Sequence, residues 1–206
     1  MNALNLAELP ILDWIQTYCR NGFLDAVLPF LSILVNKGII CIVLAIVLLS
    51  FKKTRKSGIV ISIALTIGLI AVNLTLKPLV GRIRPYDMKE GVELLVARLS
   101  DASFPSGHTL ACFEASFALL FCKHYKIAVP ALVYSVIVAF SRLYLYVHYP
   151  TDVLAGAVLG ILFALVAYLI VRTLDRKFDL DKRFSLLGMK IRKAGAKSEK
   201  DGNTKK

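Results

Sequence analysis

Long apolar runs separated by short polar breaks dominate the chain. A helix needs about 20 residues to cross the hydrocarbon core of a bilayer. Four apolar runs come close to that length: 58–77, 106–122, 127–147 and 151–171. This pattern predicts membrane-spanning helices rather than the core of a water-soluble domain.

The apolar stretch 23–51 is less regular, because Asn36-Lys37-Gly38 interrupts it. The two remaining pieces, 23–35 and 38–51, are each shorter than a comfortable span. We interpret them as two short helices that meet at a turn, with a re-entrant first piece as the alternative. Together with the longer runs they predict an all-α fold, a polytopic membrane helix bundle of about six transmembrane helices.

Composition supports the membrane assignment and shows where the excess charge lies. Hydrophobic residues make up 57% of the chain and charged residues 19%, with a mean hydropathy of +0.66, beyond the apolar content of soluble domains. From residue 172 onward, 12 Lys+Arg stand against 5 Asp+Glu, so much of the formal charge of +12 is in the tail. A basic tail after the last apolar helix indicates a chain end that faces anionic lipid, rather than a groove that binds nucleic acid. We predict a membrane domain at 1–172, a partly disordered, basic cytoplasmic tail at 173–206, and no nucleic-acid partner.

Short basic loops set the expected orientation. One loop holds four basic residues between positions 52 and 56, and Lys123 and Lys126 flank another. If the helices alternate, both loops and the tail fall on one side, which the excess of Lys and Arg marks as cytoplasmic. The extracytoplasmic side then receives the loop 78–105, the turn 148–150 and the Asn36 turn.

The same outer side collects ionisable residues from three separate regions of the chain. Positive residues there run against the usual topological bias, which favours a functional role. The set comprises Lys77, Arg82, Arg84, His108, Arg142, His148 and Asp152.

The first two of these regions have both a functional and a simpler interpretation. In the segment 77–85, a Lys and an Arg could be snorkelling at the interface. In the segment 103–109, Pro, Ser and Gly at a helix start leave backbone N–H groups free to meet an anion, which the helix dipole also favours. An ordinary helix start has a similar composition.

The third region, 141–152, places Asp152 four residues after His148 at a helix entrance. Asp152 could be a first-turn acid that complements the helix dipole. It could also accept the imidazole N–H of His148 and fix the tautomer, which frees the other ring nitrogen to attack.

In order and separation, the three regions resemble the signature of the type 2 phosphatidic acid phosphatase family, K-x6-RP, PSGH and SR-x5-H-x3-D. Each part matches completely: Lys77 with Arg84-Pro85, Pro105 to His108, and Ser141-Arg142 with His148 and Asp152. The resemblance implies the family's six-helix membrane plan over roughly 10–172. It also implies a helical core shared with soluble class A bacterial acid phosphatases and vanadium haloperoxidases.

The resemblance further implies a role for each matching residue. His148 would attack phosphorus and form a phosphohistidine, oriented by Asp152, while His108 protonates the leaving oxygen and later activates water. The residues implied to bind phosphate are Lys77, Arg84, Ser106, Gly107 and Arg142. No metal ion and no cofactor is expected, because no carboxylate or His/Cys cluster has the spacing of metal ligands.

A site at the ends of membrane helices meets lipid head groups, so we expect a membrane lipid phosphate or pyrophosphate as substrate. Undecaprenyl pyrophosphate is favoured on the family resemblance alone, with phosphatidylglycerophosphate and phosphatidic acid as alternatives. The expected protein is a multi-pass, metal-independent hydrolase of the cell membrane with an extracytoplasmic active site. The sequence identifies neither the lipid nor the oligomeric state.

A lipid transporter is the main alternative that is not an enzyme. A transporter predicts ionisable residues near helix midpoints. The apolar runs contain little of this kind beyond Glu114. We interpret Glu114 as a hydrogen-bonding residue that faces the bundle. Arg82 falls between motif positions and receives no role. The loop 86–102 is a candidate lid or head-group selector, and Gly156-xxx-Gly160 is interpreted as a helix-packing motif within the bundle.

Overall fold

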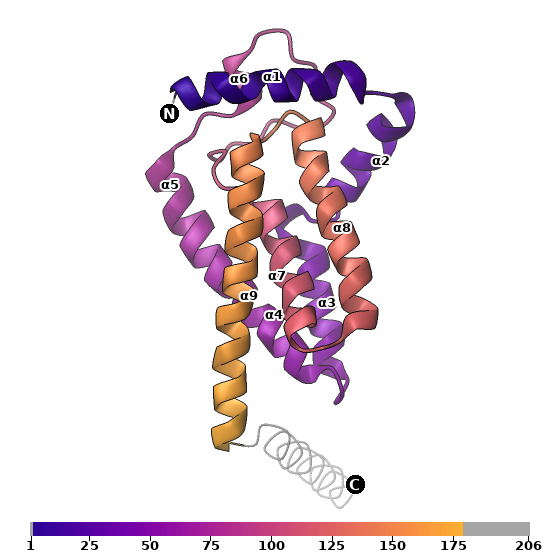
Figure 1. Cartoon of the computed structure of the whole chain (residues 1–206), viewed down its shortest axis with the longest axis vertical. Coiled ribbons are helices and arrows are strands. Elements are labelled where there is room, and N and C mark those ends of the chain that lie inside the picture. Colours follow the sequence, from indigo (N-terminus) through magenta and orange to yellow (C-terminus); the bar gives the residue numbers. More distant parts are fainter. Residues whose placement is uncertain (1, 179–206) are drawn as a thin grey trace, which may run out of the picture. The chain divides into compact units, whose positions relative to one another are not determined.

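The computed structural model describes residues 2–178, and the elements in this range are helices (Figure 1). In chain order they are α1 (Asn2–Tyr18), α2 (Gly22–Ile33), η1 (Asn36–Gly38), α3 (Ile39–Ser50), α4 (Arg55–Gly68), η2 (Leu69–Leu76), α5 (Lys77–Val80), α6 (Pro85–Met88), α7 (Gly107–Phe121), α8 (Tyr125–Tyr144) and α9 (Pro150–Phe178). The chain divides into two compact units, residues 1–168 and 169–206. The first unit contains α1 to α8 and residues 150–168 of α9.

The described part of the second unit is the carboxyl-terminal part of α9. This helix continues through residue 172, where we placed the boundary between membrane domain and tail, and reaches Phe178. The rest of the predicted basic tail, with its expected disorder and cytoplasmic location, lies outside the described residues.

Several helices have the length and composition of membrane spans. Within the described residues these are Arg55–Met88, Tyr125–Tyr144 and Pro150–Lys177, with a fourth if the bent pair Gly22–Ile33 and Asn36–Ser50 is one span. Large apolar side chains are exposed along their outer faces, as a lipid environment favours. Examples are Val43, Val47, Val133, Leu154 and Val158. The chain is therefore an all-α, multi-pass membrane protein, and the count of six spanning helices stays a prediction.

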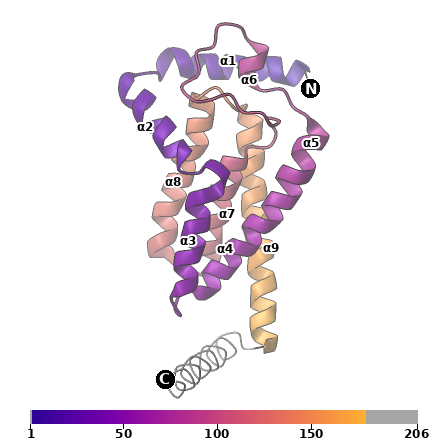
Figure 2. The ribbon, with the colours of Figure 1, turned by 180° about the vertical axis from the view of Figure 1, so that it is seen from behind.

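The break at Asn36 is present, but it bends the chain instead of reversing it. Lys37 and Gly38 both adopt left-handed backbone conformations, with φ of 54° and 70°. The chain then resumes a helix, and α2 and α3 lie end to end with a bend of 45° (Figure 2). The expectation of two short helices is thus confirmed. The expected turn between them is a bend, and the two helices continue in the same general direction.

Helix α7 is central and short. Its 15 residues span about 22 Å at 1.5 Å per residue, less than the hydrocarbon thickness of about 30 Å. The run predicted as a span at 106–122 therefore contains an apolar helix that is shorter than the hydrocarbon core. Glycines of α9 pack against its first turns, since a Cβ at Gly156 would lie 2.6 Å from the Ser106 carbonyl oxygen. The packing role expected for Gly156-xxx-Gly160 is confirmed.

Helix α1 was not predicted from the apolar pattern. It lies across the end of the bundle where α8 ends and α9 begins (Figures 1 and 2). Its buried residues are Asn5, Glu8, Leu12 and Ile15, and its exposed large residues include Leu4, Ile11 and Trp14. The turns that contain the two basic loops, α3–α4 and α7–α8, lie at the opposite end of the bundle.

Candidate active site

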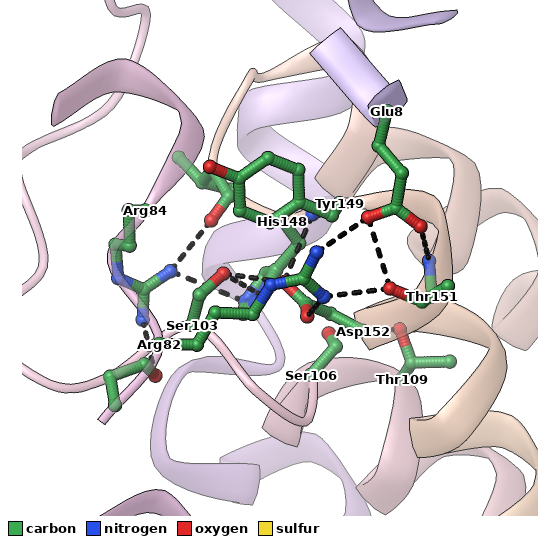
Figure 3. Close-up of polar contacts among 12 residues, drawn as sticks. Glu8, Arg82, Arg84, Ser103, Ser106, Thr109, His148, Tyr149, Thr151 and Asp152 are labelled. Atoms are coloured by element: carbon green, nitrogen blue, oxygen red, sulfur yellow. Dashed lines mark hydrogen bonds and ion pairs between the residues drawn. The ribbon is translucent and has the colours of Figure 1, made fainter. Parts of the chain in front are cut away.

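The structure brings the three predicted regions together near α1 (Figure 3). A π-helical stretch, η2, leads from α4 to Lys77, and widened turns of this kind are frequent at functional sites. The α5 helix then ends at Gly81, whose φ of 55° suits a residue without a Cβ. Beyond it, Arg84 Nη1 lies 3.4 Å from His148 Nε2 and donates to the Val147 carbonyl oxygen at 2.8 Å.

His148 is 1% exposed in the turn between α8 and α9. Its Nδ1 lies 3.4 Å from Asp152 Oδ2 and 3.4 Å from Ser103 Oγ. Contacts of this length are weak, but catalytic hydrogen bonds are often long before substrate binds. Ser103 Oγ also donates to Asp152 Oδ2. The Nδ1 side of the ring therefore faces the carboxylate, and Nε2 faces Arg84.

The surroundings of His148 favour its neutral form. Burial lowers the pKa of His148 well below its ordinary value of 6.5, and three cations lower it further. These cations are Arg84, Arg142 and Lys77. A neutral imidazole has the lone pair that a nucleophile needs.

Asp152 is fully buried, and both carboxylate oxygens have donors. Oδ1 pairs with Arg82 Nη1 at 2.5 Å, and Oδ2 accepts the Tyr149 N–H at 3.0 Å as well as the Ser103 hydroxyl. Its main-chain oxygen accepts the Ser106 N–H at 3.0 Å. One residue thereby fixes the second and third regions to each other.

Lys77 and Arg84 converge on the carboxylate of Asp101. Arg84 Nη2 donates to Asp101 Oδ1 at 2.6 Å, and Lys77 Nζ donates to Oδ2. Partial burial would raise the pKa of Asp101, but Lys77 and Arg84 lower it to about 2. The side chain is 51% exposed. Asp101 belongs to the candidate lid loop, and no spacing in the sequence indicated that it would meet these cations.

Arg142 supplies a third buried cation. It is 3% exposed and donates from Nη1 to Ser32 Oγ. Its Nε is buried and has no hydrogen-bond partner among the described residues. Because an unpaired buried donor is costly, this guanidinium is suited to bind an anion.

The start of α7 lies beside Lys77. A Cβ built on Gly107 would lie 3.9 Å from Lys77 Nζ, so the positive end of the helix dipole and an ammonium group adjoin. Ser106 is buried, and its Oγ accepts the Thr109 hydroxyl at 3.0 Å. Both predicted residues thus lie where an anion would be stabilised.

His108 lies at the same end of α7. Its Nε2 is 2.9 Å from Asn36 Oδ1, at the bend between α2 and α3. The ring interacts electrostatically with His148 and Arg142. The two histidines therefore belong to one site and lie on the same side of the bundle.

A cavity of about 870 Å³ begins at these residues and extends between α3, α4 and α7. Lys77, Asp101 and His108 line it at one part. Most of its other lining residues are apolar, including Ile42, Ala45, Ile46, Leu65 and Leu69. Glu114 lines the cavity too and is buried, as expected, but its Oε1 has no hydrogen-bond partner in the described chain, so the expected hydrogen bond is not found for that atom.

Arg82, which received no role from the motifs, pairs with two buried carboxylates. Arg82 is 4% exposed, and its guanidinium pairs with Glu8 Oε2 at 2.6 Å as well as with Asp152 (Figure 3). The sequence contains only a weak indication that α1 meets Arg82, because Asn5, Glu8, Leu12 and Ile15 share one face of a helix.

In the part of the chain that the structure describes, no group of three or more His, Cys, Asp or Glu side chains could hold a metal ion.

Comparison with known proteins agrees with this geometry. The sequence model of the PAP2 superfamily matches residues 56–176. An undecaprenyl-diphosphatase of Sulfolobus acidocaldarius is 32% identical over 143 residues, covering 69% of this chain and 68% of that protein. The undecaprenyl-diphosphatase BcrC of Bacillus subtilis is 30% identical over 149 residues, covering 72% and 76%.

A solved structure is similar as well. The crystal structure of a transmembrane PAP2-type phosphatidylglycerolphosphate phosphatase from Bacillus subtilis has a TM-score of 0.64 at 28% identity, covering 86% of this chain and 89% of that one. The matched sequence range contains all three motifs and begins after α1. The chain belongs to the PAP2 superfamily.

Proposed function

We propose that the protein is a metal-independent lipid phosphatase that releases phosphate from a membrane lipid phosphate or pyrophosphate. The observation that carries this proposal is a buried histidine next to three cations, at a site continuous with a largely apolar cavity of about 870 Å³. The cations suit a phosphate group, and the cavity suits part of a hydrocarbon chain.

The first half-reaction uses His148 as nucleophile. Its Nε2 lone pair attacks phosphorus, an N–P bond forms, and the bond from phosphorus to the leaving oxygen breaks with its electron pair. His108 donates a proton to that oxygen. Arg84, Arg142 and Lys77 stabilise the negative charge on the phosphoryl oxygens during the transfer.

The second half-reaction releases phosphate. His108, now without its proton, accepts one from a water molecule, and the water oxygen attacks the phosphohistidine. The N–P bond breaks, its electron pair returns to Nε2, and inorganic phosphate leaves. Asp152 stabilises the Nδ1–H of His148 throughout.

Undecaprenyl pyrophosphate is the favoured substrate, because relatives that match about 70% of the chain are named undecaprenyl-diphosphatases. Phosphatidylglycerophosphate is the second candidate, since the solved relative is a phosphatase of that lipid. We place the site on the extracytoplasmic side, because the two described basic loops lie at the other end of the bundle.

Phosphate release from a lipid panel tests the proposal. The purified wild-type protein would be assayed in detergent with undecaprenyl pyrophosphate, phosphatidylglycerophosphate, phosphatidic acid and a water-soluble phosphate ester, each with and without a metal chelator. We expect hydrolysis of a lipid substrate, fastest for undecaprenyl pyrophosphate, that persists in chelator. Hydrolysis that requires added divalent metal would contradict the metal-free mechanism.

Trapping the covalent intermediate tests the nucleophile. Labelled substrate should transfer phosphate to the wild-type protein, and the label should survive alkali but be lost in acid, as an N–P bond requires. His148→Gln should show neither label nor turnover. His124→Gln, in the α7–α8 turn at the far end of the bundle, is the matched control and should behave as wild type. Turnover retained by His148→Gln would reject the assignment.

A further inference from the structure

The Arg82 guanidinium is held by side chains from two distant parts of the chain. From α1, Asn5 Oδ1 accepts its Nε–H at 2.8 Å and Glu8 Oε2 pairs with Nη2 at 2.6 Å. From the start of α9, Thr151 Oγ1 lies 2.7 Å and Asp152 Oδ1 lies 2.5 Å from Nη1. The guanidinium therefore links α1 to the carboxylate that faces His148 (Figure 3).

Glu8 also accepts two hydrogen bonds from Thr151. Its Oε1 accepts the Thr151 N–H at 3.2 Å, and Oε2 accepts the Thr151 hydroxyl at 3.0 Å. The Tyr149 ring covers the guanidinium carbon of Arg82 at 4.0 Å from the ring centroid. Arg82, Glu8 and Asp152 are all buried, so the three charges act on one another with little screening by water.

The number of charges in this group has a chemical consequence. Two carboxylates share one guanidinium, so the group as a whole is negative. If Arg82 paired with Asp152 alone, its charge would offset that of the carboxylate that must stabilise the Nδ1–H of His148. Glu8 takes part of the Arg82 interaction, which leaves Asp152 a stronger acceptor for the imidazole.

Asn5 and Glu8 come from a segment that the family match does not cover. The match begins at residue 56, whereas Asn5 and Glu8 lie in α1. On the helix, Asn5, Glu8, Leu12 and Ile15 form the buried face, so the packing of Leu12 and Ile15 sets the depth at which the Glu8 carboxylate meets Arg82.

We propose that Glu8 and Arg82 are positioning residues for the phosphatase reaction, and that they act on His148 through the Asp152 carboxylate. The inference rests on the proposed function, with His148 as nucleophile. Neither residue touches the reacting phosphoryl group. Both residues fix the orientation of the Asp152 carboxylate and determine the net charge beside His148.

Kinetics of isosteric variants test the proposal. Glu8→Gln keeps the shape of the side chain and removes its charge. We expect kcat and the rate of phosphohistidine formation to fall about 10–100-fold, as for groups that orient a functional histidine from behind, with KM little changed. Asp13→Asn is the matched control: it removes a carboxylate of the same helix that pairs with Lys89 at 2.7 Å, and it should keep wild-type kinetics.

The pH profile separates positioning from a merely structural role. The charged or titratable groups that act on His148 are Arg84, Arg142, Lys77, Asp101 and His108, with Asp152 in contact. The acid limb of kcat/KM contains the titration of His148, because attack needs the neutral ring. Removing the negative charge in Glu8→Gln should move this limb to lower pH, and removing the positive charge in Arg82→Gln should move it to higher pH. The titration of the substrate is common to all variants and cancels in the comparison.

Arg82→Lys supplies a second, charge-conserving variant. Lysine keeps the charge but cannot form the forked contacts, so we expect a low kcat with the acid limb near its wild-type position. Wild-type kcat in either Glu8→Gln or Arg82→Lys would overturn the proposal, as would limbs of Glu8→Gln and Arg82→Gln that move in the same direction. If Glu8→Gln does not fold, Arg82→Lys carries the same test. A wild-type protein without activity on the lipid panel would instead reject the proposed function.

Discussion

Arg84 donates to the carboxylate of Asp101 at 2.6 Å, and the other oxygen of that carboxylate accepts from Lys77. An anionic group of the protein thus binds two of the three cations that we assign to the substrate phosphate. Since the pKa of Asp101 is about 2, the group stays ionised at every pH at which the protein would act. A phosphate must share these cations with Asp101 or displace it.

Removing the charge of Asp101 should strengthen phosphate binding. For Asp101→Asn we expect KM, and the inhibition constant of vanadate, to fall about two- to fivefold, the modest effect of a half-exposed ion pair. Steady-state kinetics with vanadate inhibition would measure both. Asp87→Asn, which breaks the exposed pair with Arg98 at 2.8 Å in the same loop, is the control. A higher KM in Asp101→Asn would show that Asp101 positions the cations instead of competing for them.

His148 should make the stability of the protein depend on pH. Its pKa in the folded protein is lowered by burial and then by the nearby cations, so the folded state binds fewer protons than the unfolded state. Its contribution to stability is complete above pH 6.5 and is lost as the pH falls below that value, at about 1.4 kcal/mol per pH unit until the folded pKa is reached. Thermal unfolding in detergent between pH 5 and 7.5 would measure this loss.

The comparison with His148→Gln isolates this contribution, because the variant keeps the other two histidines. Its melting temperature should fall less than that of the wild type over the same pH range. Added inorganic phosphate should reduce the wild-type loss, since a bound anion stabilises a protonated ring. Parallel curves for the two proteins would show that His148 titrates normally.

Arg142 should contribute chiefly to phosphate binding. Its unpaired Nε can donate to a phosphate oxygen, and hydrogen bonds to charged groups are worth about 1.5–3 kcal/mol, or about 10–100-fold in affinity. We expect Arg142→Lys to raise the inhibition constant of vanadate within this range. Isothermal titration or inhibition kinetics would measure it, with Arg98→Lys, in the exposed loop, as the control. Unchanged vanadate affinity would remove Arg142 from the phosphate site.

Gly156 should tolerate no side chain. A Cβ there would approach the Ser106 carbonyl oxygen to 2.6 Å, and backbone cannot move aside as a flexible side chain can. Gly156→Ala should lower stability by about 1–3 kcal/mol and reduce activity, because Ser106 N–H also bonds to the Asp152 carbonyl oxygen. Denaturant unfolding and phosphate release would measure the two effects.

Gly22→Ala is the matched substitution in open space, since nothing lies within 4 Å of the added carbon. It should keep wild-type activity and stability. Equal stability of the two alanine variants would mean that α9 can shift away from α7 at little cost.

The convergence of the three motifs could be predicted because it follows from helix alternation. Once the apolar runs alternate across a bilayer, Lys77, His108 and His148 have to lie at ends of helices that face the same side. The pattern also located the break at Asn36, but the dihedral angles of Lys37 and Gly38, which decide between a bend and a reversal, cannot be read from residue types.

The contributions of Glu8, Arg82 and Asp101 could not be predicted, for physical reasons. Arg82 and Arg84 are two residues apart and chemically identical, yet one pairs with two buried carboxylates and the other with a half-exposed one. Which carboxylate each meets depends on the packing of α1 and of the loop before α7. Such contacts between distant segments have no characteristic spacing in the sequence.

The bend at residues 36–38 also affects how water, the second reactant, reaches the site. Backbone that leaves a helix at membrane depth is tolerated only where protein covers it or where it borders water, and Asn36 and Lys37 are exposed and line the cavity. Asn36 is also the hydrogen-bond partner of His108, the residue assigned to deprotonate the hydrolytic water. We therefore expect solvent to enter the cavity along the bend, beside the residue that accepts a proton from the hydrolytic water.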